Sequence, residues 1–203
     1  RRGVLVSELS GTGNIVIKAR ERGLAVPHGD EARRILEQVK LLESRGFQYE
    51  GAEASFELLV RHAQPDYRPP FELVDFMVVV EKKRRSPTQK NLEETLSEAM
   101  IKVKVGNEII HTAAEGEGPV NALDLALRKA LIAHYPAIAK FQLADYKVRI
   151  LDSNSGTAAT TRVLIDTQNG TKRWSTVGAS ANIIEASWRA LADAVEYGLM
   201  IAC

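Results

Sequence analysis

The sequence predicts an α+β protein in which two tandem βββα repeats form a pseudo-twofold domain that dimerises, with a small helical subdomain in front of them. Three observations support this prediction. Hydrophobic residues recur with a helical period up to about residue 66 and with a period of two beyond residue 70. The pattern of residues 71–203 occurs twice. Each copy ends in an amphipathic helix.

Composition narrows the class of protein. The 203 residues carry a formal net charge of +1, with 45% hydrophobic and 26% charged residues. This near-neutral balance argues against binding to nucleic acid or to a membrane surface, and no apolar stretch is long enough to span a bilayer. Cys203 is the only cysteine, which excludes disulfides within the chain and fits a cytoplasmic location. Because the chain starts at Arg1 without Met, we expect it to be part of a longer polypeptide.

Residues 1–66 are predicted to form a helical linker subdomain. One helix is expected over 30–44, with Asp30 as its N-cap and Gly46 just beyond its end. Its apolar stripe consists of Ile35, Leu36, Val39 and Leu42. A second helix is expected over 52–62. Two short helices bury little against each other, so they either pack on something outside this chain or form a small subdomain of their own. Prolines at 65, 69 and 70 mark the boundary that follows.

The internal repeat is the central feature of the sequence. Residues 71–80 match residues 141–150 at an offset of 70, and beyond them the offset becomes 64, so that Ile101 corresponds to Ile165 and Ala122 to Ala186. The polar run 84–94 supplies the six extra residues of the first copy and is predicted to be a flexible surface loop. We call residues 71 to about 134 repeat A and residues 141–203 repeat B.

Each repeat is predicted to contain three strands and a helix. In repeat A the strands cover 71–81, 99–105 and 108–114, and the helix covers 120 to about 134. Hairpin turns between the second and third strands are indicated by Gly106-Asn107 in repeat A and by Asn169-Gly170 in repeat B. The helix of repeat B starts near Asn182. A three-stranded sheet with one helix leaves its edges unpaired, and pairing between copies removes that hazard, which favours a dimer.

Catalytic motifs are missing from the sequence, which contains no nucleophile elbow, no P-loop and no His-Glu-x-x-His. His111 is a conceivable general base, but its strand context favours a structural role. Asp75 and Asp145 occupy equivalent positions in the two repeats. They would form a catalytic dyad only if they lay close together with one pKa raised; fixing the same local geometry twice is the simpler interpretation.

Residues 113–123 contain the most specific ligand-binding signal. A strand passes through Gly116 and Gly118 into a helix whose first turn holds Pro119. Glycine lets backbone approach a ligand, and a helix start offers unpaired N–H groups to a carboxylate; a tight connection is the equally simple alternative. The small residues 156–160 either leave room for a compact apolar ligand or accommodate a neighbouring helix.

These stretches resemble the C-terminal region of the 2-isopropylmalate synthase, homocitrate synthase and citramalate synthase family. The matching segments are Glu115–Leu123, Asp145–Arg149, Trp174–Gly178 and Asn182–Trp188, together with Leu9–Ile15 and Gly46–Leu59 in the linker. The Gly46–Leu59 and Asn182–Trp188 segments look most like the citramalate synthase branch, which implies isoleucine biosynthesis.

The resemblance implies an acyltransferase whose acyl group becomes an alkyl group on transfer. A TIM barrel preceding this chain would condense acetyl-CoA with a 2-oxo acid, using a divalent metal. The chain itself would hold no catalytic residue, metal or cofactor. Residues 71–203 would be the allosteric domain, forming a homodimer and binding end-product isoleucine or leucine for feedback inhibition.

The resemblance also implies which residues contact the effector. They are Gly116, Gly118, Pro119, Val120, Asn121, Leu143, Tyr146, Ile150, Thr157 and Ala159. The glycine turn suits the effector's carboxylate, and Leu143, Ile150 and Ala159 suit its apolar side chain. The carbonyls around Gly116 or the Asp145 side chain are candidates for its ammonium group. Thr157 and Ile150 stand where family members carry alanine, which leaves the choice between isoleucine and leucine open.

Two alternatives remain at this stage. The domain can be a dimerisation and assembly module of the same enzyme that binds no ligand. It can also be an independent enzyme that uses Asp75, Asp145 or His111.

Overall fold

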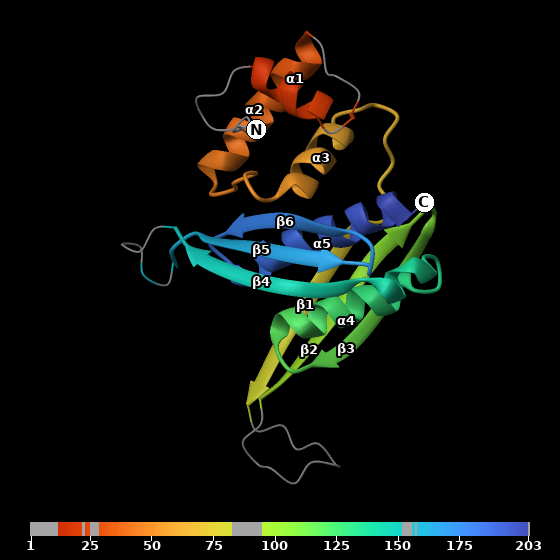
Figure 1. Ribbon diagram of the computed structural model, residues 1–203. Helices are drawn as coiled ribbons and strands as arrows, with labels where there is room; N and C mark the ends of the chain where they lie inside the picture. The colour runs from red at the N-terminus through yellow and green to blue at the C-terminus, as the bar shows by residue number, and fades with distance from the viewer. Residues whose placement is uncertain are drawn as a thin grey trace. The chain divides into compact units, whose positions relative to one another are not determined.

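The fold class predicted from the sequence is confirmed by the computed structural model (Figure 1). The structure describes residues 12–21, 23–24, 29–82, 95–151, 156 and 158–202. These residues divide into two compact units. The repeat A unit contains Pro69–Phe141 and the chain from Gly198, and the linker–repeat B unit contains the described residues up to Arg68 together with Gln142–Tyr197. Each unit is described by itself.

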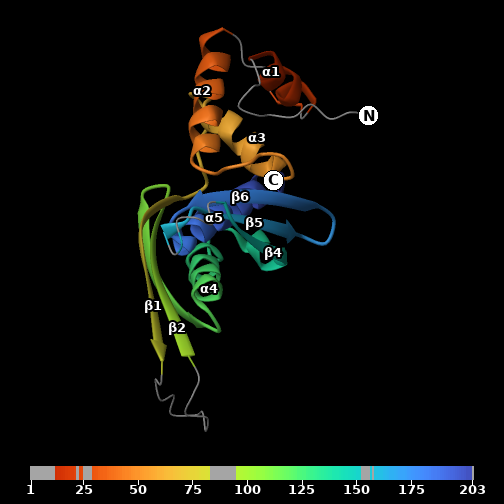
Figure 2. The same ribbon diagram turned by 90° about the vertical axis from the view of Figure 1, so that its left-hand side faces the viewer.

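Repeat A is a three-stranded antiparallel sheet with one helix, as expected. Its strands β1 (Glu72–Lys82), β2 (Thr95–Val105) and β3 (Glu108–Gly116) pair in the order β1-β2-β3. Helix α4 (Pro119–Leu131) packs on this sheet (Figure 2), and η1 (Pro136–Lys140) follows. Strand β2 starts four residues before the predicted position and α4 ends three residues before it. The predicted loop over 84–94 lies outside the described residues.

Repeat B has the same topology, with β4 (Gln142–Ile150), β5 (Thr161–Gln168), β6 (Arg173–Ser180) and α5 (Ile183–Ala202). The correspondence extends to details that the sequence pattern does not show. A register shift falls between Leu73 and Asp75 in β1 and at the equivalent place, between Leu143 and Asp145, in β4. Thr112 and Thr176, which are 64 residues apart, donate to the α4 carbonyl of Ala126 and the α5 carbonyl of Ala190 at 2.9 and 2.8 Å.

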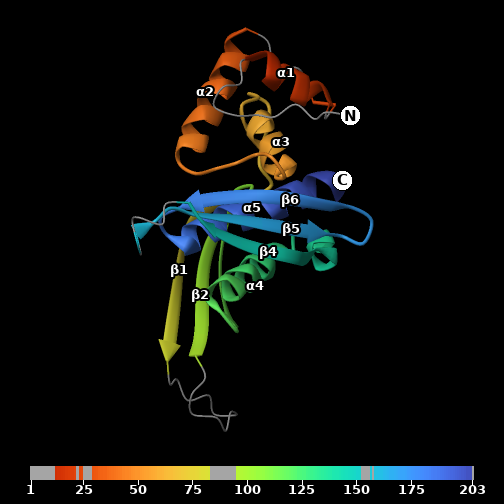
Figure 3. The same cartoon turned by 60° about the vertical axis from the view of Figure 1, so that its left-hand side comes forward.

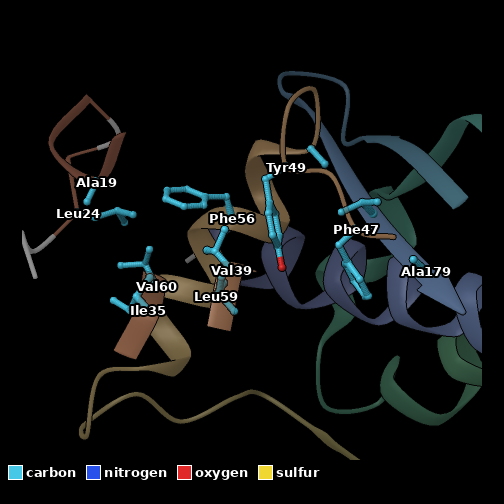
Figure 4. Packing of buried hydrophobic residues seen from close by; sticks show 12 residues of the cluster. Ala19, Leu24, Ile35, Val39, Phe47, Tyr49, Phe56, Leu59, Val60 and Ala179 are labelled. Atoms are coloured by element: carbon cyan, nitrogen blue, oxygen red, sulfur yellow. The ribbon is translucent and has the colours of Figure 1, made fainter. Parts of the chain in front are cut away.

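The linker helices α1 (Thr12–Glu21), α2 (Asp30–Ser44) and α3 (Glu53–His62) pack on repeat B. A buried cluster (Figure 4) joins all three helices to the sheet through Val177 and Ala179 of β6. Its members are Ala19, Leu24, Ile35, Val39, Phe47, Tyr49, Ala52, Phe56, Leu59, Val60, Val177 and Ala179. The structure shows neither of the two expected arrangements by itself, because the linker helices pack on another part of the same chain. The predicted domain boundaries, 1–66 and 71–203, stay a prediction.

Helix α3 covers the edge of the repeat B sheet (Figure 3). Strand β6 is an edge strand, and its Val177 N–H donates to Ser55 Oγ of α3 at 3.0 Å. An uncovered strand edge invites pairing with other chains, so α3 protects this sheet. Almost every side of α3 is enclosed as a result, with residues from Ala54 to Val60 buried.

The N-cap of α2 differs from the prediction. Gly29, with φ 55°, occupies the N-cap position and Asp30 is the first helical residue. Asp30 and Glu31 instead place negative charge in the first turn, where it is favourable next to the helix dipole. Gly46 does follow the helix as expected, with φ 97°. A side chain there is also excluded sterically, since a Cβ would lie 2.6 Å from Leu151 Cδ1.

Candidate functional site

The β3–α4 turn of repeat A is closely packed at Gly116. A Cβ at this position would lie 2.5 Å from the Ala122 nitrogen and 2.7 Å from Asn121 Oδ1. Asn121 Oδ1 also accepts a hydrogen bond from the Glu117 N–H at 3.1 Å. Gly116 is therefore required by the return of the α4 backbone towards β3, which is the structural alternative to a ligand-binding role. Gly118 differs, since nothing lies within 4 Å of its Cβ position.

The two repeats begin their helices in different ways. In repeat B, Asn182 Oδ1 accepts from the N–H groups of Ile184 and Glu185 at 2.8 and 3.3 Å. The equivalent residue of repeat A is Gly118, the N-cap of α4, whose backbone carbonyl accepts from Ala122 N–H at 2.9 Å. Gly118 has no side chain that can accept from the first-turn N–H groups of Val120 and Asn121. Those N–H groups lie at the N-terminal end of α4, where the positive end of the helix dipole favours an external carboxylate.

Strand β4 carries the second group of predicted contacts. Leu143, Tyr146 and Ile150 pair with Thr167, Ile165 and Thr161, and the register shift places all three on one face of the sheet. Tyr146 identifies this face as the one towards α5, because its hydroxyl lies 2.7 Å from Ser187 Oγ. Leu143 and Ile150 are 39% and 61% exposed, so apolar surface is available on β4.

Asp145 lies on the opposite face of the sheet from these three residues. It bonds to Lys147 at 2.6 Å, and this hydrogen bond is the largest influence that lowers the pKa of Asp145. With Lys147 it borders a polar cavity of about 230 Å³ lined by Gly51, Asp145, Lys147, Leu164, Asp166 and Ser175. The Asp145 side chain therefore lies on the opposite face of the sheet from Leu143 and Ile150, which does not favour it as the partner of the effector's ammonium group.

The remaining predicted contacts follow β4. Ala159 is buried, at 5% exposure, whereas Thr157 lies outside the described residues. Gly116, Gly118, Pro119, Val120 and Asn121 belong to the repeat A unit, and Leu143, Tyr146, Ile150 and Ala159 belong to the linker–repeat B unit. In the repeat A unit the predicted residues lie on one turn, whereas in the linker–repeat B unit Leu143, Tyr146 and Ile150 share one face of β4 and Ala159 lies in the segment before β5.

The rival catalytic residues have ordinary surface environments. Asp75 is an exposed strand residue bonded to Lys102 at 3.0 Å. The lowered pKa of Asp145 is the opposite of what a shared-proton dyad requires. His111 is an exposed residue of β3 that pairs with Lys102 in the sheet. In the part of the chain that the structure describes, no group of three or more His, Cys, Asp or Glu residues is placed to hold a metal ion.

Sequence reasoning missed a polar contact between α3 and α5. Ser55 Oγ donates to Asp193 Oδ2 at 2.6 Å, and Glu196 Oε1 accepts from Tyr67 at 2.7 Å and lies 2.6 Å from His62 Nε2. Although part of Asp193 remains accessible, lost hydration is the largest cause that raises the pKa of its carboxyl group to about 7, and the charge of Glu196 adds to it. The only sequence signal was a set of acidic residues on otherwise apolar helix faces.

None of the helices that the structure describes is both long and apolar enough to cross a membrane.

Comparison with known proteins agrees with the duplicated fold. Residues 50–199 match the family model described as the LeuA allosteric (dimerisation) domain. The chain is 51% identical over 197 residues to the (R)-citramalate synthase of Geobacter sulfurreducens, covering 97% of this chain and 36% of that protein. It is 47% identical over 203 residues to the (R)-citramalate synthase of Synechocystis sp., covering 98% and 36%.

The (R)-citramalate synthase of Aquifex aeolicus is 41% identical over 203 residues, covering 98% of this chain and 37% of that protein. The chain thus spans little more than a third of the length of these relatives, and its likeness to them is strong from end to end. The family resemblance predicted from the sequence is confirmed: the chain belongs to the family of the LeuA allosteric (dimerisation) domain.

Proposed function

We propose that this chain is the regulatory region of an acetyl-CoA-dependent acyltransferase of the citramalate synthase type, and that it binds isoleucine or leucine as a feedback inhibitor. The family match and the names of the relatives support the parent activity. Acetyl-CoA and a divalent metal would bind to a TIM barrel elsewhere in the parent protein. A cytoplasmic location stays a prediction of the same kind.

The start of α4 is the observation that carries effector binding. A free amino acid presents a carboxylate, and the N–H groups of Val120 and Asn121 are donors for it at a helix start whose N-cap lacks a side chain. The equivalent end of α5 is filled by Asn182. The duplication thus leaves one helix start for an external carboxylate, while the other is closed by its own side chain.

Strand β4 supplies the apolar part of the proposed site. Leu143 and Ile150 present exposed apolar surface on the face that Tyr146 shares, which suits a branched aliphatic side chain. Ala159 and Thr157 are proposed to contact the same side chain. Inhibition requires that the amino acid bind one conformation of the parent more tightly; a coupling of about 1–3 kcal/mol changes affinity roughly 5–150-fold.

The two different helix starts provide a matched test of this site. Gly118→Asn gives α4 the cap that α5 already has, and its Cβ meets nothing within 4 Å. We expect calorimetry to show binding of isoleucine or leucine to the wild type, and a loss of at least about tenfold in affinity for Gly118→Asn with no loss of stability. The control Asn182→Gly removes the α5 cap and should leave the affinity unchanged.

The proposal fails if neither amino acid gives heat or a thermal shift with the wild type. It also fails in its carboxylate assignment if Gly118→Asn binds as tightly as the wild type.

A dimerisation module without an effector is the second candidate. Large apolar side chains are exposed on the first strand of each repeat, which is an edge strand of its sheet. They are Leu73, Val74, Met77, Val79 and Val80 of β1 and Leu143, Val148 and Ile150 of β4. Such surface on edge strands is a hazard unless another chain covers it. A stable dimer that ignores every amino acid tested would favour this function.

A further inference from the structure

The polar contact between α3 and α5 is built largely from side chains that can gain or lose a proton. Four side-chain contacts join the two helices and the segment after α3: Ser55 to Asp193, His62 and Tyr67 to Glu196, and Tyr197 to Glu57 at 3.2 Å. Both glutamates are buried, with side chains 8% and 9% exposed. The contact places the carboxyl groups of Asp193 and Glu196 in the same partly enclosed space.

Few positive charges compensate these carboxyl groups. Ser55 has a single hydroxyl hydrogen, which goes to Asp193 while its oxygen accepts from Val177 N–H. The charged and titratable groups that face Asp193 are His62 from α3, Arg189 and Glu196 from α5, Tyr49 from the segment before α3 and Tyr67 from the segment after it. Burial raises the pKa of Tyr49, and the negative charges of Asp193 and Glu43 raise it further.

We infer that this contact is a proton-sensitive clasp, which holds α3 and the linker helices on repeat B while the Asp193 carboxyl group is protonated and loosens when that group ionises. Ionisation adds a second negative charge beside Glu196 in a space with little hydration. The clasp lies where the linker meets the regulatory repeat. The clasp does not depend on the binding of any amino acid, so its test is independent of the test of the proposed function.

His62 acts in the same direction. Its hydrogen bond with Glu196 is the largest cause that raises the pKa of His62 above its usual 6.5, and the charges of Glu196 and Asp193 add to this. A group whose pKa is higher in the closed than in the open state favours closure at low pH and loses that contribution as pH rises through its closed-state value. For Asp193 the loss runs from about pH 4 to about pH 7, and for His62 it starts near 6.5.

Hydrogen exchange of the α3 amides tests the clasp in the complete 203-residue chain, without any amino acid added. After correction for intrinsic exchange rates, protection of 53–62 should fall by on the order of tenfold between about pH 5.5 and 8.5. The Asp193→Asn variant keeps the size of the side chain and cannot ionise, so most of this dependence should disappear. The control Asp75→Asn makes the same change at an exposed carboxyl group of β1 and should behave as the wild type.

A second variant and a second measurement separate the two titrating groups. His62→Gln should retain the part of the dependence below about pH 7 that belongs to Asp193. Carbon-detected NMR of the Asp193 carboxyl group in the wild type should give a midpoint near 7. A midpoint near 4 overturns the inference, and so does an Asp193→Asn variant whose α3 protection changes with pH as the wild type's does.

Discussion

Gly178 of β6 illustrates how tightly repeat B is packed between its sheet and helix. A Cβ at this position would overlap the carbonyl oxygen of Ala186 and would lie 3.0 Å from the Ala190 nitrogen. Because both neighbours are backbone atoms of α5, they cannot move aside independently of the helix. Repeat A has Ala114 at the equivalent position.

We expect Gly178→Ala to destabilise the linker–repeat B unit by about 1–3 kcal/mol or more, since the added methyl group must displace α5. Urea unfolding followed by tryptophan fluorescence reports on this unit, because Trp174 and Trp188 both lie in it. Gly170→Asn is the control: it lies in the β5–β6 turn at φ 87° with nothing within 4 Å of its Cβ position. Asparagine adopts positive φ more readily than most residues but is still strained there, so this change should cost at most about 1 kcal/mol. Equal effects of the two substitutions would contradict the packing argument.

Single residues also show where sequence reasoning reached its limit. The glycine turn was predicted from the local sequence and the β4 contacts from the family resemblance, and their contact with an effector stays a prediction. The position of Asp145 on the opposite face from Leu143 was not predicted, since alternation alone does not reveal the register shift after Leu143. The contact of Ser55 with Asp193 joins residues 138 positions apart, and nothing local in the sequence connects them.

Among the helices and strands, the hydrogen bond from each third strand to its helix is the feature that the two repeats share most closely. Thr176 is fully buried and donates to Ala190 O, whereas Thr112 is partly buried and donates to Ala126 O. Each hydroxyl fixes the height of its helix along the strand. Valine keeps the shape of threonine but cannot donate.

Thr176→Val should therefore lower the free energy of unfolding by about 1 kcal/mol, a typical net value for such a bond. Thr112→Val should cost less, because water can reach its more accessible position. Thermal unfolding of the two variants, followed by circular dichroism, compares them directly. A larger loss for Thr112→Val than for Thr176→Val would contradict the burial argument.

The repeated elements were predictable because their cores repeat. Buried Ile101 and Ile165, and buried Ala122 and Ala186, stand at one offset and mark the same places in strand and helix. The linker helices were predictable individually but not in their packing. Their apolar stripes indicate that they pack on some surface. The sequence does not identify that surface, because Val177 and Ala179 could equally be core residues of repeat B alone.

At the scale of the whole chain, the exposed apolar side chains of β1 and β4 and the match to a dimerisation domain point to association. We expect sedimentation equilibrium to give twice the chain mass of 22.4 kDa. Lysine on an edge strand opposes pairing, so Val80→Lys on β1 or Val148→Lys on β4 should weaken the dimer, and the more damaging variant locates its interface. A mass of one chain at micromolar concentration, or dimers that neither variant weakens, would count against edge-strand association.

The cluster that joins α1–α3 to β6 has a practical consequence for anyone who transfers the two repeats to another protein. The proline-rich stretch 63–70 invites a cut there, yet such a cut would strip the cover from Val177 and Ala179 and leave the Val177 N–H without Ser55. A transferred piece that begins at Phe71 would therefore expose an apolar surface and an unpaired strand edge on β6. A longer piece that includes the preceding helices would keep this surface of β6 covered.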